Sequence, residues 1–230
     1  LRTNKDKKRN YDYVVMLQDA YYKVVERDLG SIAHLKKDDN PEAYVKVYEL
    51  YKGLDARQEA IKPILPLYIN GENVAFKFNN YSDNIFQYRN KASNYLFEKG
   101  LALLENEDKT SMREAYNTLE YLQTINPNYE NTAELINEAH QRGMDYILVA
   151  INNDTEQIIP KRLEDDLLSV DTYGLNKFWS TYHVNKLPNL DYDYTLQLNL
   201  KQINISPEQI KEREFVREKE IVDGWQYVLD

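Results

Sequence analysis

Residues 115–135, AYNTLEYLQTINPNYENTAEL, decide the fold, because a helical pattern stops there at a proline and restarts almost at once. Ala115, Leu119 and Leu122 are three or four residues apart, so a helix places all three on one stripe. Pro127 ends that helix, since its ring fixes the backbone and its nitrogen has no proton to donate. The pattern therefore predicts two helices joined by a tight turn.

The dipeptide Asn40-Pro41 marks the same stop and restart earlier in the chain. Asparagine is a favoured N-cap residue, and proline at the first helical position costs no hydrogen bond. We therefore expect a helix from Pro41 to about Ile61. The preceding segment, 10–37, has apolar residues at helical spacing and forms either one helix or two that are divided near Gly30. Its predicted apolar stripe begins with Tyr13, Leu17, Ala20, Val24 and Val25.

The segment 67–78, LYINGENVAFKF, changes character. Asn70-Gly71 is a strong signal for a two-residue turn, and apolar residues alternate after it, so we expect a β-hairpin inserted among the helices. Asp83 is the expected cap of a long helix that ends near residue 105. Ser111 is the expected start of the helix quoted first.

The Ala-x3-Leu-x2-Leu-x4-Pro spacing of residues 115–127 resembles the second helix of a tetratricopeptide repeat. Upstream, NYLFEKGLALL at 94–104 resembles the first helix of such a repeat, with Gly100 at the small position where the two helices touch. Downstream, a helix from just after residue 129 to about residue 142 would place Ala133, Ile136 and His140 on its packing face. The resemblance implies a mostly α, tetratricopeptide-like domain over 11–142. The alternative is an irregular helical bundle.

The remaining residues, 143–230, predict a small α/β domain that we expect to continue past Asp230. YILVAINN is a continuous apolar run typical of a buried strand, and YTLQLNLKQINIS alternates as a strand with a bend near residue 201. The predicted elements are a strand at 146–153, a helix at 160–170, a helix at 173–185 that contains Trp179, a strand at 194–206 and two further strands between 213 and 229.

A second resemblance covers the whole layout. LPLYINGENVAFKFNNYSD at 65–83, LEYLQTINPNY at 119–129 and the long stretch from DYTLQLNL to VDGW at 193–225 resemble envelope lipoproteins of Bacteroidota-type bacteria. The resemblance implies a periplasmic or outer-membrane-associated accessory protein, a subunit of an outer-membrane complex that binds other envelope proteins. Because the chain has no cysteine, membrane contact would need a lipid anchor upstream or a partner.

Composition argues against several classes of function. The net charge of −9 disfavours nucleic-acid binding, which needs lysine and arginine against phosphates. Seven glycines and the absence of cysteine disfavour phosphate loops, thiolate zinc sites and cysteine nucleophiles. The histidines stand far apart, with no second ligand three or four residues away, so we predict no metal site and no cofactor. They are His34, His140 and His183.

Twenty tyrosines favour an interaction surface, because tyrosine offers contact area with little rotamer entropy to lose. The prediction is a non-enzymatic scaffold, with Tyr95, Tyr116 and Tyr121 as candidate partner-binding residues; the alternative is that these rings fill helix–helix seams. The rival function is a carbohydrate- or peptidoglycan-binding module or a hydrolase in the C-terminal region. It would need a cleft that pairs Glu164 or Asp166 with Trp179.

Overall fold

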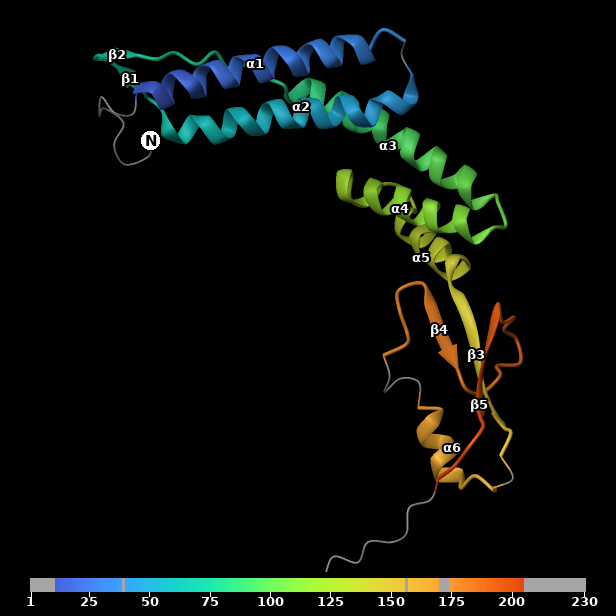
Figure 1. Cartoon of the computed structure of the whole chain (residues 1–230). Helices are drawn as coiled ribbons and strands as arrows, with labels where there is room; N and C mark the ends of the chain where they lie inside the picture. The colour runs from blue at the N-terminus through green and yellow to red at the C-terminus, as the bar shows by residue number, and fades with distance from the viewer. Residues whose placement is uncertain (1–10, 39, 156, 170–173, 205–230) are drawn as a thin grey trace, which may run out of the picture.

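The computed structural model describes residues 11–38, 40–155, 157–169 and 174–204. Five helices come first and lie side by side in chain order, and a small parallel sheet extends from the last of them (Figure 1). The five helices are α1 (Tyr11–Leu35), α2 (Pro41–Ile61), α3 (Ser82–Leu104), α4 (Lys109–Ile125) and α5 (Thr132–Gly143). The mostly α character that the sequence predicts is confirmed.

Helix α1 is continuous through Gly30, so the alternative of two shorter helices is wrong. A glycine inside a helix costs about 1 kcal/mol relative to alanine, which is too little to end a helix that packs on both sides of it. The buried residues of α1 do continue past the glycine: they are Val14, Tyr21, Asp28 and Ile32.

Helix starts are set by short polar side chains. The Asn40 side chain accepts a hydrogen bond from the backbone N–H of Glu42, which confirms the predicted cap of α2. Asp108, not Ser111, caps α4, and its carboxylate accepts the Ser111 backbone N–H at 2.8 Å. Asp83 lies within the first turn of α3 and is not its cap. Those two sequence-based starts are wrong by one to three residues, because aspartate and serine serve equally well as caps and as first-turn residues.

Helices α3 and α4 approach each other closely at Gly100. A Cβ atom placed on Gly100 would lie 2.5 Å from Leu119 Cδ2, so only glycine fits there. Ala115, Leu119 and Leu122 of α4 are completely buried, as their spacing predicted. The next helix differs from expectation, because its buried residues are Thr132, Leu135 and Ala139.

The predicted packing face of α5 is therefore wrong by about one residue. Ala133 is exposed, while Ile136 and His140 are half-buried. The turn after α4 contains two residues with positive φ, Asn128 and Glu130. That turn rotates the start of α5 in a way that side-chain spacing alone does not reveal.

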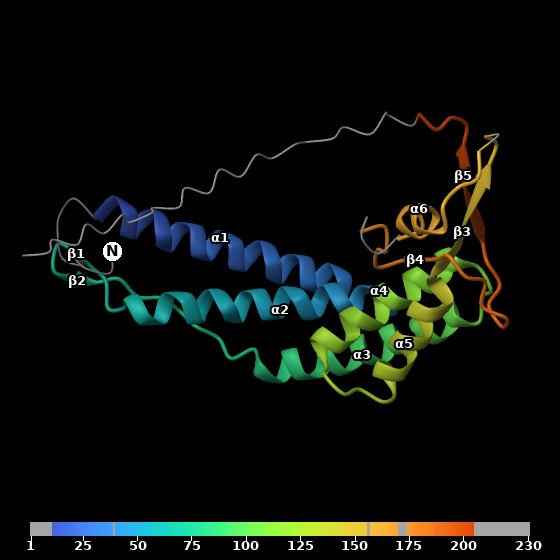
Figure 2. The same ribbon diagram turned by 90° about the horizontal axis from the view of Figure 1, so that it is seen from below.

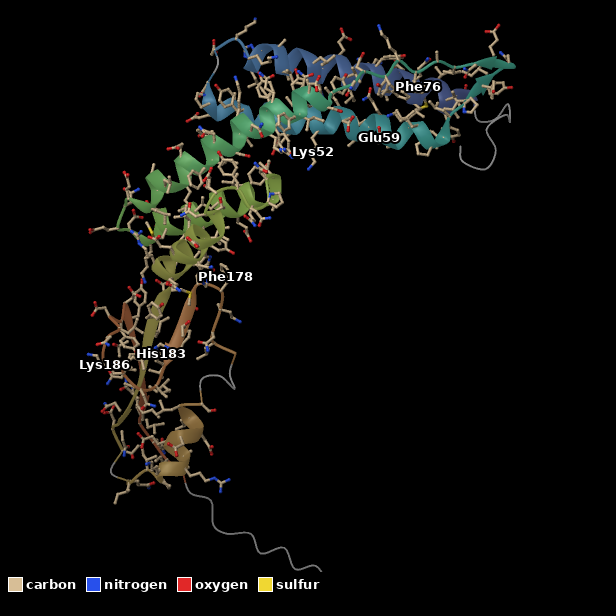
Figure 3. All side chains as sticks on the ribbon, turned by 180° about the vertical axis from the view of Figure 1, so that it is seen from behind. Lys52, Glu59, Phe76, Phe178, His183 and Lys186 are labelled. Atoms are coloured by element: carbon tan, nitrogen blue, oxygen red, sulfur yellow. The ribbon has the colours of Figure 1, made fainter. Side chains whose placement is uncertain are left out.

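The hairpin forms at the predicted place but is short. β1 (Tyr68–Ile69) pairs antiparallel with β2 (Glu72–Asn73) across Asn70-Gly71, whose φ values are 51° and 85°. The residues after it do not continue as a strand. They run as an extended segment, 74–80, beside α1, and Figure 3 shows Phe76 in this position.

One backbone hydrogen bond, from the Val74 N–H to the Leu67 carbonyl at 2.8 Å, continues the hairpin, and side chains hold the rest of segment 74–80. The buried Gln58 amide donates to the Asn79 carbonyl at 2.9 Å and accepts the Asn79 N–H at 2.7 Å. Tyr21 donates to the Lys77 carbonyl, and its ring contacts those of Phe76 and Phe78. The alternating aromatics that suggested a strand are thus used to pack an extended chain onto a helix.

After α5 the chain forms a three-stranded parallel sheet with strand order β4-β3-β5. Its elements are β3 (Asp145–Asn153), α6 (Lys161–Leu167), β4 (Ser180–His183) and β5 (Tyr194–Leu200). The helix predicted at 173–185 is wrong, since Ser180–His183 pair with β3 as a strand. The strands predicted between 213 and 229 lie outside the described residues, and β5 ends just before the predicted bend.

Candidate functional site

A groove between α2 and α4 is the part of the structure that best matches the predicted partner surface. Helix α3 packs against both α2 and α4 and thereby brings these two helices close to each other (Figure 2). The groove has a volume of about 390 Å³. Its lining residues are Tyr48, Glu49, Lys52, Gly53 and Ala56 of α2 and Tyr121, Thr124 and Ile125 of α4. We call it the α2–α4 groove.

Tyr121 joins the two walls of the groove. Its hydroxyl donates to the Glu49 carboxylate at 2.7 Å. Burial raises the pKa of Tyr121, and the hydrogen bond to Glu49 raises it further, so the hydroxyl stays protonated and remains a donor at neutral pH. The hydrogen bond therefore holds the Tyr121 ring in one orientation.

The groove combines an apolar floor with exposed charges. Tyr48 and Ile125 are buried beneath it. The Lys52 ammonium lies 5.8 Å from the centre of the Tyr48 ring and is exposed, and Figure 3 shows it beside α4. Chemically, this arrangement offers an ammonium donor, Lys52, and a carboxylate, Glu49, that already contacts Tyr121 and Lys46, above aromatic surface. That set suits a polypeptide segment with mixed apolar and polar side chains.

The other two candidate tyrosines lie elsewhere. Tyr95 is half-buried on α3 and packs against the helical core. Tyr116 is on a different face of α4 from Tyr121, where its ring contacts those of Phe178 and Trp179, each at 5.2 Å between ring centres. The structure therefore does not bring the three tyrosines onto one surface, and only Tyr121 lines the groove. Partner binding by Tyr95 and Tyr116 stays a prediction.

Tyr116 belongs to a junction that joins the helices to the sheet. His140 Nε2 lies 2.8 Å from the Phe178 carbonyl oxygen, and the Trp179 ring packs on Gly143, where a Cβ would come within 2.8 Å of it. Gly143 ends α5 as predicted, but the structure uses its missing side chain to make room for an indole. Figure 3 shows Phe178 at this junction.

Ion pairs reinforce the same junction. Arg113 Nη2 donates to Asp145 Oδ2 at 2.7 Å, and Lys109 Nζ contacts both Asp145 and Asp193. Burial acts to raise the pKa of Asp145, but hydrogen bonds from Arg113 and Lys109 outweigh it and hold the pKa below the ordinary value of 3.8. The pKa of Asp193 is lowered for the same reasons, with Lys109 as its main partner. These groups hold the sheet against α4.

The residues of the rival hydrolase site are not brought together. Glu164 and Asp166 are exposed on α6, which follows the end of β3. Trp179 lies beside the start of β3, where its carbonyl accepts the Asp145 N–H at 2.8 Å. Nine residues of strand separate these two ends, a span of about 30 Å. Catalysis by Glu164 and Asp166 stays untested.

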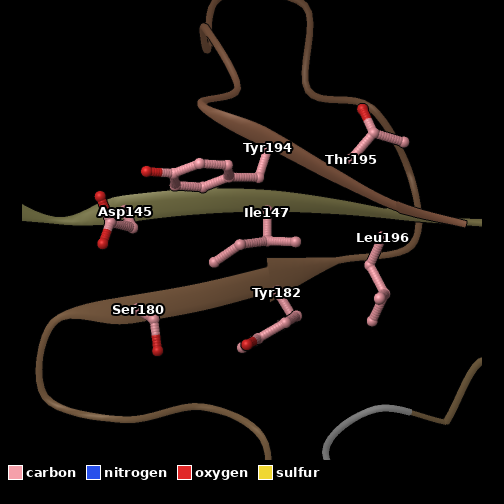
Figure 4. A pocket seen from close by; sticks show the side chains of 7 residues that line it. All are labelled: Asp145, Ile147, Ser180, Tyr182, Tyr194, Thr195 and Leu196. Atoms are coloured by element: carbon pink, nitrogen blue, oxygen red, sulfur yellow. The ribbon is translucent and has the colours of Figure 1, made fainter.

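The sheet carries a second hollow that sequence reasoning missed. It has a volume of about 350 Å³ and is shown in Figure 4. Its lining residues are Asp145, Ile147, Ser180, Tyr182, Tyr194, Thr195 and Leu196. The Tyr194 side chain is 62% exposed above it. The alternation of β5 predicts one apolar face, but nothing local reveals that this part of the face stays uncovered.

The predicted absence of a metal site remains a prediction. Within the residues that the structure describes, no three His, Asp or Glu side chains are grouped so that they could hold a metal ion. His34 is exposed on α1, and His183 Nδ1 lies 3.0 Å from the Tyr192 hydroxyl. Among the described helices, none has the length and apolar character needed to cross a membrane.

No protein-family model, curated protein or solved structure matches this chain.

Proposed function

We propose that this protein is a non-enzymatic accessory scaffold that binds a segment of a protein partner in the α2–α4 groove. The observation that carries the proposal is the open groove with Tyr121 fixed across it by Glu49. A side chain that is already oriented loses little entropy on binding, so its contact contributes more to affinity.

The partner segment would lie along the groove between the two helices. Its apolar side chains would contact the Tyr121 ring and the surface around Ala56, and its carbonyl or carboxylate oxygens would meet Lys52. The stacked helices supply rigidity, because each buries one face against the next. Recognition of this kind needs no reacting group.

The tetratricopeptide-like register is part of this proposal. Its support is the contact of Gly100 with Leu119 and the complete burial of Ala115 and Leu122, the positions at which such a repeat packs its helices. The location is proposed as well. The resemblance to envelope lipoproteins supports a periplasmic or outer-membrane-associated protein whose partners are other envelope proteins, within an outer-membrane complex.

The experiment is site-specific photo-crosslinking in native cells, with the crosslinker at Lys52 in the groove or, as a control, at Glu164 on α6. We expect one protein to be captured from Lys52 and not from Glu164. Tyr121→Ala should then reduce capture at least tenfold, which is about 1.4 kcal/mol, at a temperature where circular dichroism shows that the variant is still folded. Equal capture from both positions would contradict the proposal.

The matched acidic variant tests the rival hydrolase. Glu164→Gln combined with Asp166→Asn should leave capture from Lys52 unchanged, because both residues lie on α6, away from the groove. If this double variant abolished the biological activity of the protein while Tyr121→Ala retained it, the scaffold proposal would be wrong and the hydrolase would replace it.

A second candidate function, carbohydrate binding, is favoured by one observation. Tyr194 presents an exposed ring at the sheet hollow, and Tyr182 and Ser180 line the same hollow from the other side of β3. Exposed aromatic rings beside hydroxyl groups suit the apolar face and edge hydroxyls of a sugar. Binding to purified peptidoglycan or to soluble glycans should then be lost in Tyr194→Ala and kept in Tyr95→Ala. No binding by the wild-type protein would remove this candidate.

A further inference from the structure

Helix α1 leaves an apolar row partly uncovered along the edge of its contact with α2. Among the helices that the structure describes, α2, α3 and α4 each pack between two others, whereas α1 packs mainly on α2 (Figure 1). The row was expected to be buried, but Tyr13 is 63% exposed and Ala20 is exposed. We call Tyr13, Leu17, Ala20 and Val24 the α1 seam.

The α1 seam borders a shallow groove along α2. This groove has a volume of about 270 Å³ and is lined by the seam residues Leu17, Ala20 and Val24 together with Tyr21, Arg57, Ala60 and Ile61. Its small residues leave room for the side chains of another helix. The seam has the three- and four-residue spacing with which helices pack against each other.

The charges beside the seam have a polarity along α1. Asp12 and Asp19 lie on one side of its N-terminal half, and Lys23 and Arg27 lie on the same side of its C-terminal half, together with one acidic residue, Glu26. Lys23 and Asp19 are already in contact at 2.7 Å, which confirms that they share this side. A second α1 running in the opposite direction would therefore place acidic residues against basic ones.

The C-terminal half of the α1 seam lies beside two guanidinium groups that contact the same carboxylate. Asp28 is buried and pairs with both Arg27, at 2.9 Å, and Arg57, at 2.7 Å. Two guanidinium groups thus share one buried carboxylate, with the exposed Glu26 one residue before Arg27. An acidic side chain from a bound helix would give one of these guanidinium groups a second carboxylate partner.

The register follows from the rise of the helix, which is 1.5 Å per residue. Asp12 lies about 12 Å before Ala20 along the axis, and Arg27 lies about 10.5 Å after it. If Ala20 of each copy sits at a two-fold axis, Asp12 of one copy and Arg27 of the other come to nearly the same level. Alanine at the axis also allows the two helices to approach closely.

We infer that two copies of this chain associate through the α1 seam, with their α1 helices antiparallel and Ala20 at the two-fold axis. The interface is isologous, so each favourable charge pair occurs twice. The inference concerns a surface separate from the α2–α4 groove and does not depend on the proposed partner.

Sedimentation equilibrium tests the association directly. The wild-type protein should show twice the 27.3 kDa mass of the monomer at tens of micromolar, and Ala20→Glu should show the monomer mass. Ala20 is exposed and glutamate is a good helix former, so this variant should keep its far-ultraviolet circular dichroism and its melting curve. A wild-type monomer at all concentrations, or a dimer that survives Ala20→Glu, would overturn the inference.

Cysteine crosslinking tests the geometry, because the chain has no cysteine of its own. Ala20→Cys should form a disulfide-linked dimer under mild oxidation, at least tenfold faster than Ala33→Cys. Ala33 is the matched control, since it is also an exposed alanine of α1 and lies away from the seam. Equal crosslinking rates for the two variants would show that collisions, not the α1 seam, bring the copies together.

Discussion

Gly100→Ala adds one methyl group at the contact between α3 and α4. The new Cβ atom would lie 2.5 Å from Leu119 Cδ2 and 2.8 Å from Leu119 Cγ, well inside van der Waals contact. Leu119 is completely buried, so it has little space into which it can retreat. We therefore expect the substitution to push α3 and α4 apart or to force Leu119 into a strained rotamer.

Two contributions of opposite sign set the change in the free energy of unfolding that Gly100→Ala causes. Overpacking a well-packed contact costs about 1–3 kcal/mol, and alanine in place of glycine inside a helix returns about 1 kcal/mol. Gly30→Ala is the matched control, since nothing lies within 4 Å of the Cβ position at Gly30 in α1. That variant should be stabilised by up to about 1 kcal/mol. The difference between the two variants should therefore be about 1–3 kcal/mol, with Gly100→Ala the less stable.

The assay is urea unfolding followed by circular dichroism at 222 nm, with both variants and the wild type measured at the same protein concentration. Combining Gly100→Ala with Leu119→Val should recover part of the lost free energy, because the smaller side chain makes room for the methyl group. Equal changes in the free energy of unfolding for Gly100→Ala and Gly30→Ala would show that α3 and α4 do not meet at Gly100. The proposed repeat register would then be wrong.

Three further outcomes follow from other contacts. Ala115→Trp should lower the free energy of unfolding by about 1–3 kcal/mol, since Ala115 has no exposed surface; an unchanged urea midpoint would place it at the surface. Gln58→Leu should cost about 1–3 kcal/mol by leaving both backbone groups of Asn79 unpaired, and should speed proteolysis within 74–80; unchanged cleavage would mean that other contacts hold the segment. The pKa of Asp145 is lowered by folding, so its stabilising contribution is complete above pH 3.8 and is lost as the pH falls below that value. The wild-type protein should therefore lose more free energy of unfolding between pH 5 and pH 3 than the Lys109→Met variant. Equal losses in the two proteins would show that the contact between Lys109 and Asp145 does not cause the pH dependence.

Local sequence features identified the elements whose geometry is set within a few residues. Asn40-Pro41 begins α2 because the asparagine side chain and the proline ring act on the adjacent backbone. Asn70-Gly71 makes the hairpin turn because these residues tolerate positive φ. Ala115, Leu119 and Leu122 are buried because their spacing matches the helical repeat. In each of these cases the cause and its effect lie within one helix or one turn.

Contacts between distant segments decided the rest. Ser180–His183 form a strand because β3 offers them an edge, although the surrounding sequence resembles a helix. The α1 seam is exposed because no other described helix covers it, and its sequence alone cannot distinguish a buried stripe from an unpartnered one. The α2–α4 groove exists because α3 holds two helices at a fixed separation, and Tyr121 faces it because of its position around α4. The sequence by itself thus determined where the first five helices lie and which residues of α4 are buried, while tertiary packing decided the packing face of α5, the strand at Ser180–His183 and which surfaces were left uncovered.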